Sequence, residues 1–206
     1  MNARILAPLS VLALLAACNS DSEPVRLPPG SAAATATPPP DAPRVMPGAA
    51  LVFSPQPGWT VEKPDPDKVN RKAQYRLPRA EGDVEDASIV VTYFGPSGAG
   101  STEMNLQRWA GQFEQPDGGP SAGVMKHASR SVNGMSVLDV DISGTYLGSG
   151  MPGAEAAGKR PGWRMLASMI ESDHGPYFVK LLGPEATVSK SEASYRSFIE
   201  SVKPAK

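Results

Sequence analysis

A change of composition near residue 49 limits how much of this chain can fold into a packed domain. Residues 19–48 hold eight prolines among Ala, Ser, Thr and Gly, with almost no large apolar side chain. Such a segment buries too little surface to offset the entropy of ordering it. We therefore expect a disordered tether over residues 18–48 and one globular domain over residues 49–206, a length that suits a single hydrophobic core.

The chain begins with the pattern of a secretion signal. Arg4 makes the start positive, and residues 5–17 form an apolar stretch without a charge. This stretch is too short for the roughly 20 apolar residues that cross a bilayer, but it has the length of the apolar centre of a signal peptide. We predict a signal peptide over residues 1–17.

The only cysteine, Cys18, follows this stretch directly. The run Leu15-Ala16-Ala17-Cys18 resembles the lipobox of bacterial lipoproteins, which implies cleavage before Cys18 and acylation there by fatty acids such as palmitate. Two or more acyl chains hold a protein stably on a membrane. The predicted localisation is the bacterial cell envelope. Since Asn19 rather than aspartate comes next, the outer membrane, facing the periplasm, is favoured over the inner membrane.

Composition excludes several classes of function. The chain has 20 basic and 21 acidic residues, so it lacks the positive charge expected of a nucleic-acid-binding protein. One cysteine excludes a disulfide framework and every site built from several thiolates. With only two histidines as well, we expect no metal site and no cofactor.

Two amphipathic helices are predicted from apolar residues that recur at i, i+3, i+4 and i+7. The first covers residues 102–112 and can be capped by Ser101 or Thr102. The second ends near Val202, and Ser189 with Glu192 has the spacing of a capping box at its start. The two apolar stripes are Leu106, Trp109, Ala110 and Phe113, and Tyr195, Phe198, Ile199 and Val202.

The remaining regular segments read as strands. Two hairpins are predicted, over residues 124–146 and 163–182, and single strands are predicted at 51–53, 59–61, 73–77 and 88–94. Asn133-Gly134 is a strong turn signal, because a type I′ turn needs positive φ at both of its central residues. Hairpins imply an antiparallel sheet, and both helices need a sheet face to cover their apolar stripes. The predicted fold class is α+β, an antiparallel sheet flanked by helices.

Asp139 and Asp141 are the best candidates for a functional pair of carboxylates. On a strand, residues two apart project from the same face, about 7 Å from each other. Such a pair can bind a cation or act as acid and base, whereas the simpler interpretation is a solvated strand face. We name Asp139 and Asp141 as a candidate binding surface on an exposed sheet face. The glycine-rich loop over residues 148–162 is an alternative contact surface.

The motifs that would indicate catalysis are incomplete. Residues 95–102 approach a phosphate-binding loop, but Ser101 stands where that loop needs a lysine. Neither Ser97 nor Ser149 lies in G-x-S-x-G, and no spacing joins either histidine to a serine and an aspartate. The acidic run 81–86 lacks the ladder of a calcium loop. No catalytic residue is therefore predicted.

Residues 175–184 with the following helix, and residues 71–78 with the earlier helix, resemble uncharacterised bacterial lipoproteins whose domain is similar to the PsbP-like α/β/α sandwich. The resemblance covers most of residues 50–206, and it implies an accessory binding module because proteins with that fold mostly serve assembly or regulation. We expect a lipid-anchored, non-catalytic envelope protein, on a membrane through Cys18 and with an envelope protein as partner. An envelope hydrolase or a small-ligand carrier on the same fold is the alternative.

Overall fold

The computed structural model describes residues 51–97, 100–148 and 158–205. All of them belong to the compact unit Pro40–Lys206. The predicted signal peptide, Cys18 and the predicted tether lie outside the described residues, and so do residues 149–157 of the predicted contact loop.

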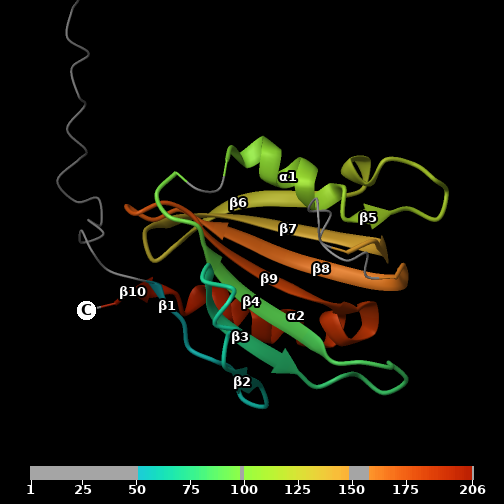
Figure 1. Ribbon diagram of the computed structural model, residues 1–206, viewed down its shortest axis with the longest axis horizontal. Coiled ribbons are helices and arrows are strands. Elements are labelled where there is room, and N and C mark those ends of the chain that lie inside the picture. The colour runs from blue at the N-terminus through green and yellow to red at the C-terminus, as the bar shows by residue number, and fades with distance from the viewer. Residues whose placement is uncertain (1–50, 98–99, 149–157, 206) are drawn as a thin grey trace, which may run out of the picture. The chain divides into compact units, whose positions relative to one another are not determined.

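The centre of the described region is one antiparallel sheet (Figure 1). Its strands lie in the order β2-β3-β4-β9-β8-β7, and the far edge of β7 is shared by β6 and β5. A separate two-stranded sheet joins β1 to β10. The bounds are β1 (Leu51–Val52), β2 (Thr60–Glu62), β3 (Arg71–Leu77), β4 (Ala87–Tyr93), β5 (Phe113–Glu114), β6 (Lys126–Val132), β7 (Met135–Tyr146), β8 (Arg160–Ile170), β9 (Tyr177–Pro184) and β10 (Lys203–Pro204).

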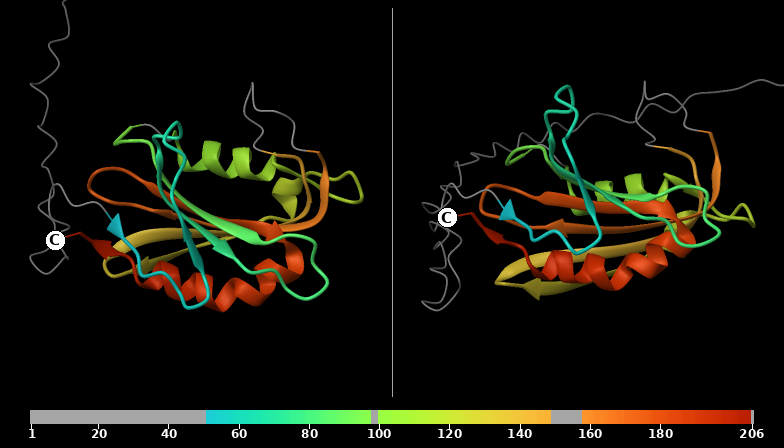
Figure 2. Two further views of the ribbon diagram at one scale, coloured as in Figure 1. Left: turned by 60° about the horizontal axis from the view of Figure 1, so that its bottom comes forward. Right: turned by 90° about the horizontal axis from the view of Figure 1, so that it is seen from below.

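Helices cover both faces of this sheet. Helix α1 (Thr102–Ala110) lies on one side and helix α2 (Glu185–Glu200) on the other, with the strands between them (Figure 2). A single 3-10 turn, η1 (Ser121–Gly123), precedes β6. The predicted α+β class, an antiparallel sheet flanked by helices, is confirmed.

Each face has its own hydrophobic core. Strand alternation directs Val137 of β7 into the core under α2 and Val140 and Ile142 into the core under α1. The apolar stripes predicted on the two helices pack into these two cores. Trp109 and Phe113 are buried on the α1 side, and Tyr195, Phe198, Ile199 and Val202 are buried on the α2 side.

The predicted hairpin turn joins β6 to β7. Asn133 and Gly134 have φ values of 49° and 83°, which is the positive-φ pair that a type I′ turn requires. The Asn133 side chain also donates hydrogen bonds to the carbonyls of Glu200 (3.0 Å) and Val202 (2.8 Å). The turn therefore holds the hairpin against the end of α2.

The boundaries of the helices differ in part from the prediction. Ser101 caps α1 as expected, accepting a hydrogen bond from the Met104 backbone, but α1 ends at Ala110, before the predicted end. The capping box predicted at Ser189 is wrong, because β9 leads directly into α2 at Pro184 and the helix begins at Glu185. Ser189 and Glu192 are instead inside the helix, where both contact Arg164.

Candidate functional site: a groove between α2 and the sheet edge

Strand β7 places the two candidate carboxylates on the face that α2 covers. Asp139 and Asp141 alternate with Val140 and Ile142, as predicted, so both project to the same side. The register puts Asp139 between Ala128 of β6 and Ser168 of β8. It puts Asp141 between Lys126 of β6 and Leu166 of β8.

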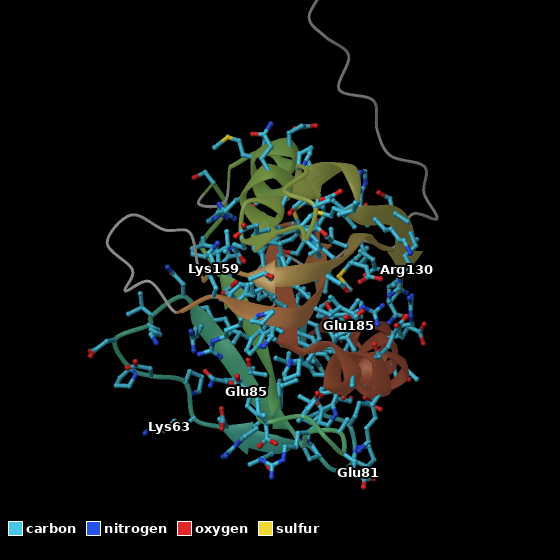
Figure 3. The ribbon with its side chains drawn as sticks, turned by 90° about the vertical axis from the view of Figure 1, so that its right-hand side faces the viewer. Lys63, Glu81, Glu85, Arg130, Lys159 and Glu185 are labelled. Carbon is cyan, nitrogen blue, oxygen red and sulfur yellow. The ribbon has the colours of Figure 1, made fainter. Side chains whose placement is uncertain are left out.

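A groove of about 290 Å³ opens beside this part of β7, between the sheet edge and α2. We call it the α2 groove. A second hollow of about 330 Å³ adjoins it and shares Lys126 and Asp141. In Figure 3, Arg130 of β6 and Glu185, the first residue of α2, mark the two sides of this region. The α2 groove is lined by Lys126, His127, Ala128, Arg130, Asp139, Val140, Asp141, Leu166, Ala167, Tyr195 and Arg196.

Asp139 forms the centre of one polar chain in the groove. The Arg130 guanidinium lies 2.5 Å from its carboxylate, and the Ser168 hydroxyl donates a hydrogen bond of 2.6 Å to it. The Tyr195 hydroxyl then has one proton for two acceptors, the Ser168 oxygen at 2.9 Å and the Val179 carbonyl at 3.2 Å. Burial raises the pKa of Tyr195 far above its ordinary value, and the charge of Asp139 acts in the same direction. Tyr195 is therefore a neutral hydrogen-bonding group.

Asp141 belongs to a second chain, built on Arg164. Arg164 donates two hydrogen bonds of 2.8 Å to the Asp141 carboxylate and a third of 2.8 Å to Glu192 on α2. Glu192 also accepts from Arg196 at 2.7 Å. The bond to Asp141 raises the pKa of Arg164, and the bonds from Arg196 and Arg164 lower the pKa of Glu192. The charged forms of Arg164, Glu192 and Arg196 are thus favoured.

These contacts decide what the carboxylate pair can do. Asp139 and Asp141 are both in ion pairs with arginines, and their side chains are only 24% and 31% exposed. The sheet face expected here is thus only partly exposed at these two residues, because Arg130 of β6 and Arg164 of β8 lie against their carboxylates. In the described ranges, no group of three His, Cys, Asp or Glu side chains is placed to hold a metal ion.

Neither histidine stands among the groove carboxylates. His127 is opposite Val140 in the β6–β7 pairing, so strand alternation directs its side chain to the face away from Asp139 and Asp141. His174 lies in the turn between β8 and β9, where its backbone carbonyl accepts a hydrogen bond from Tyr93. Neither histidine side chain is therefore directed at Asp139 or Asp141.

Strand β6 is the exposed wall of the α2 groove. It pairs with β7 along its full length in a continuous antiparallel register, and no other strand of the described region pairs with it. Its residues Lys126 to Ser129 are exposed, and it contains neither proline nor glycine. A regular edge strand of this kind presents unpaired N–H and C=O groups that can accept one more strand.

The sequence identified Asp139 and Asp141 but missed the residues that surround them. They come from three different elements: Arg130 from β6, Arg164 and Ser168 from β8, and Tyr195 from α2. These residues meet because β7 pairs with β6 and β8, and the spacing of residues along the sequence does not predict which strands pair. The Asn133-Gly134 turn is the one signal that could have found Arg130, since it fixes the register of β6 against β7.

No protein-family model and no curated protein matches the sequence. Among solved structures, the chain is similar to PA94 of Pseudomonas aeruginosa, a protein of unknown function, at 13% identity and a TM-score of 0.44, covering 65% of this chain and 82% of that one. It is also similar to CyanoP, the PsbP protein of the cyanobacterium Synechocystis, at 10% identity and a TM-score of 0.45, covering 76% and 94% of the two chains.

A third similar structure is LpqN, which is involved in cell envelope biogenesis of Mycobacterium tuberculosis. It is 9% identical with a TM-score of 0.45, and the match covers 77% of this chain and 86% of LpqN. A PsbP protein, the fold that the sequence resembles, is thus among the structural neighbours. At these TM-scores the likenesses do not bear on function, and the α+β class follows from the strand order and the two helices. Within the part of the chain that the structure describes, no helix has the length and apolarity to cross a membrane.

Proposed function

We propose that this chain is a lipid-anchored, non-catalytic binding module of the bacterial cell envelope, which captures an extended segment of an envelope protein along β6. The observation that supports it is the free edge of β6 beside the α2 groove. A segment added to β6 gains main-chain hydrogen bonds from the strand edge and specificity from its side chains in the groove.

The charge of the edge defines the partner. Strand β6 carries Lys126 and Arg130 and no acidic residue. Arg130 is paired with Asp139, whereas Lys126 forms no ion pair among the described residues. An extended segment with acidic side chains matches this surface. A second copy of the chain does not, because pairing β6 with another β6 places basic strands side by side, and like charges opposite each other destabilise a sheet.

The anchor is the lipid predicted on Cys18, and the outer membrane facing the periplasm is the proposed location. Replacing Cys18 by Ala removes the thiol that carries the lipid, so the variant moves to the soluble fraction when cells are fractionated. Cys18→Ser, which also lacks the thiol, gives the same result. A Cys18→Ala protein that still sediments with membranes contradicts the anchor, without bearing on the partner.

Site-specific cross-linking in cells tests the β6 edge. A photoreactive amino acid replaces Ser129 on β6 or, as the control, Thr60 on β2 at the opposite edge of the sheet. Both positions are exposed and lie on edge strands. We expect an adduct from position 129 and none from position 60. Mass spectrometry maps the adduct to an acidic, proline-free segment of another envelope protein.

A charge reversal completes the design. Lys126→Glu reduces the adduct at position 129 by at least tenfold, whereas Lys190→Glu, an exposed change on α2, leaves it unchanged. Equal adducts at both edges, or an adduct within a second copy or within residues 19–48 of the same chain, contradict the proposal. A small molecule that co-purifies with the protein while no adduct forms favours the alternative, a small-ligand carrier.

A further inference from the structure

A second cluster of charges lies on the opposite face of the sheet, beneath α1. Lys180 of β9 is opposite Val90 of β4, and Val90 is opposite Gln74 of β3, so these side chains follow one line across the sheet. Lys180 is also opposite Ala167, which belongs to the core under α1. This face is the one that does not carry the α2 groove.

Three cations converge on this face from three elements, and each is hydrogen-bonded to an amide. The Lys180 ammonium donates to the Gln112 amide oxygen at 3.3 Å. Arg71 of β3 donates to the Gln74 amide oxygen at 2.7 Å, and Arg108 of α1 donates to that of Asn105. We call Arg71, Arg108 and Lys180 the cationic cluster.

The helix contributes to the cluster through a polar stripe. Asn105, Arg108 and Gln112 are spaced at i, i+3 and i+7, so they share one side of the helix and its end. Asn105 and Gln112 are buried, at 1% and 4% exposure. Buried amides are costly unless they are hydrogen-bonded, and here their oxygens are directed at cations.

The charges in the cluster are not compensated by the described residues. In that part of the chain, none of the three cations forms an ion pair with a carboxylate, whereas Arg76, on the same strand as Arg71, pairs with Glu62 at 2.9 Å. Burial, with a smaller contribution from the positive charges of Arg108 and Arg71, lowers the pKa of Lys180 to about 8. An anion in the cluster would remove this repulsion.

We propose that Arg71, Arg108 and Lys180 form a binding site for a phosphate group on the face of the sheet that α1 covers. Two guanidinium groups and one ammonium offer several N–H donors to the oxygens of one anion. A phosphate group carries more than one negative charge, whereas a single carboxylate would leave most of the positive charge unpaired. The site is independent of the function proposed for β6, because it lies on the other face of the sheet.

The test uses the full chain, purified from membranes in detergent, and Lys180→Met with Lys190→Met as a matched control. Lys190 is exposed on α2, so the control makes the same chemical change on the opposite face. Inorganic phosphate is titrated at constant ionic strength while the melting temperature and the heat of binding are measured. The wild type and Lys190→Met show saturable binding, and Lys180→Met binds at least tenfold more weakly.

A folding defect does not explain this pattern, because Lys180→Met removes a repelled charge and is expected to melt at a higher temperature than the wild type without phosphate. Short-chain phosphatidic acid, a phosphate monoester added as a monomer, gives the second arm. Tighter binding of this lipid than of inorganic phosphate identifies a lipid headgroup as the source of the phosphate, and equal or weaker binding identifies a free phosphate compound.

Two results overturn the proposal. One is the absence of saturable binding of either probe to the wild type, and the other is equal binding to the wild type and Lys180→Met.

Discussion

The two faces of the sheet differ in how their charges are compensated. On the α2 face, the half-buried groups Arg130, Asp139, Asp141, Arg164 and Glu192 are all in ion pairs. On the α1 face, Arg71, Arg108 and Lys180 are hydrogen-bonded to amides. Removing one partner of an ion pair leaves the other charge unpaired and destabilises the fold. Removing a charge that its neighbours repel stabilises the fold. The same kind of substitution should therefore have opposite effects on the two faces.

Removing Arg164 should give the largest effect. Arg164→Met leaves Asp141 and Glu192 without their shared partner, and the Arg164 side chain is only 14% exposed. We expect a loss of about 2–3 kcal/mol in the free energy of unfolding, measured in urea, after allowing for the partly exposed carboxylates. Arg196→Met, whose side chain is 58% exposed, should lose less than about 1 kcal/mol. Equal losses of stability in both variants would show that the ion pairs of Arg164 with Asp141 and Glu192 contribute no more than the exposed pair of Arg196.

The second prediction concerns alkaline pH and the α1 face. Lys180 has a pKa near 8 in the folded protein and 10.5 ordinarily, so the unfolded chain binds more protons between these values. Stability therefore rises with pH in that range, by about 2 kcal/mol between pH 7.5 and 9.5. Arg71 and Arg108 are the charged groups that act on Lys180 from β3 and α1.

Urea unfolding at several pH values checks this prediction. Lys180→Met should lose the rise in stability, while Lys190→Met should keep it. A rise of the same size in Lys180→Met would mean that another group titrates and that Lys180 is not repelled in the fold.

The smallest effect on stability is expected at acidic pH, from Glu192 on the α2 face. The pKa of Glu192 lies below its ordinary value of 4.5 because Arg196 and Arg164 donate to its charged form. Its contribution to stability is thus present above pH 4.5 and is lost as the pH falls through the lowered pKa. Glu192→Gln should be less stable than the wild type by up to about 1 kcal/mol at pH 6, with a smaller difference at pH 3.5. A difference that does not shrink on acidification would contradict this linkage.

Much of the fold could be predicted from the sequence, because its determinants are local. The two helical stripes, the alternation of β7 and the Asn133-Gly134 turn each depend on residues a few positions apart, and all three are confirmed. The start of α2 could not be predicted from Ser189 and Glu192. Their capping-box pattern was present, but β9 passes into the helix at Pro184 and the two side chains bind Arg164 instead.

The site could be predicted only in part, because its residues come together through the fold rather than through local spacing. Asp139 and Asp141 stand out in sequence, yet their partners come from β6, β8 and α2 through strand pairing. Lys180 left a local signal, a lone charge between Val179 and Leu181 in an apolar strand. Its neighbours Arg71 and Arg108 are distant in sequence, so only the fold shows that three cations meet.

The unfolding free energies of Arg164→Met and Lys180→Met, measured in urea at pH 7 in one phosphate-free buffer, test the difference between the faces most directly. The account predicts opposite signs: Arg164→Met is less stable than the wild type, and Lys180→Met is more stable, by about 1–2 kcal/mol because Met keeps most of the apolar stem without the charge. A Lys180→Met protein that is less stable than the wild type would mean that the α1 face compensates its charges as the α2 face does, and would contradict the account.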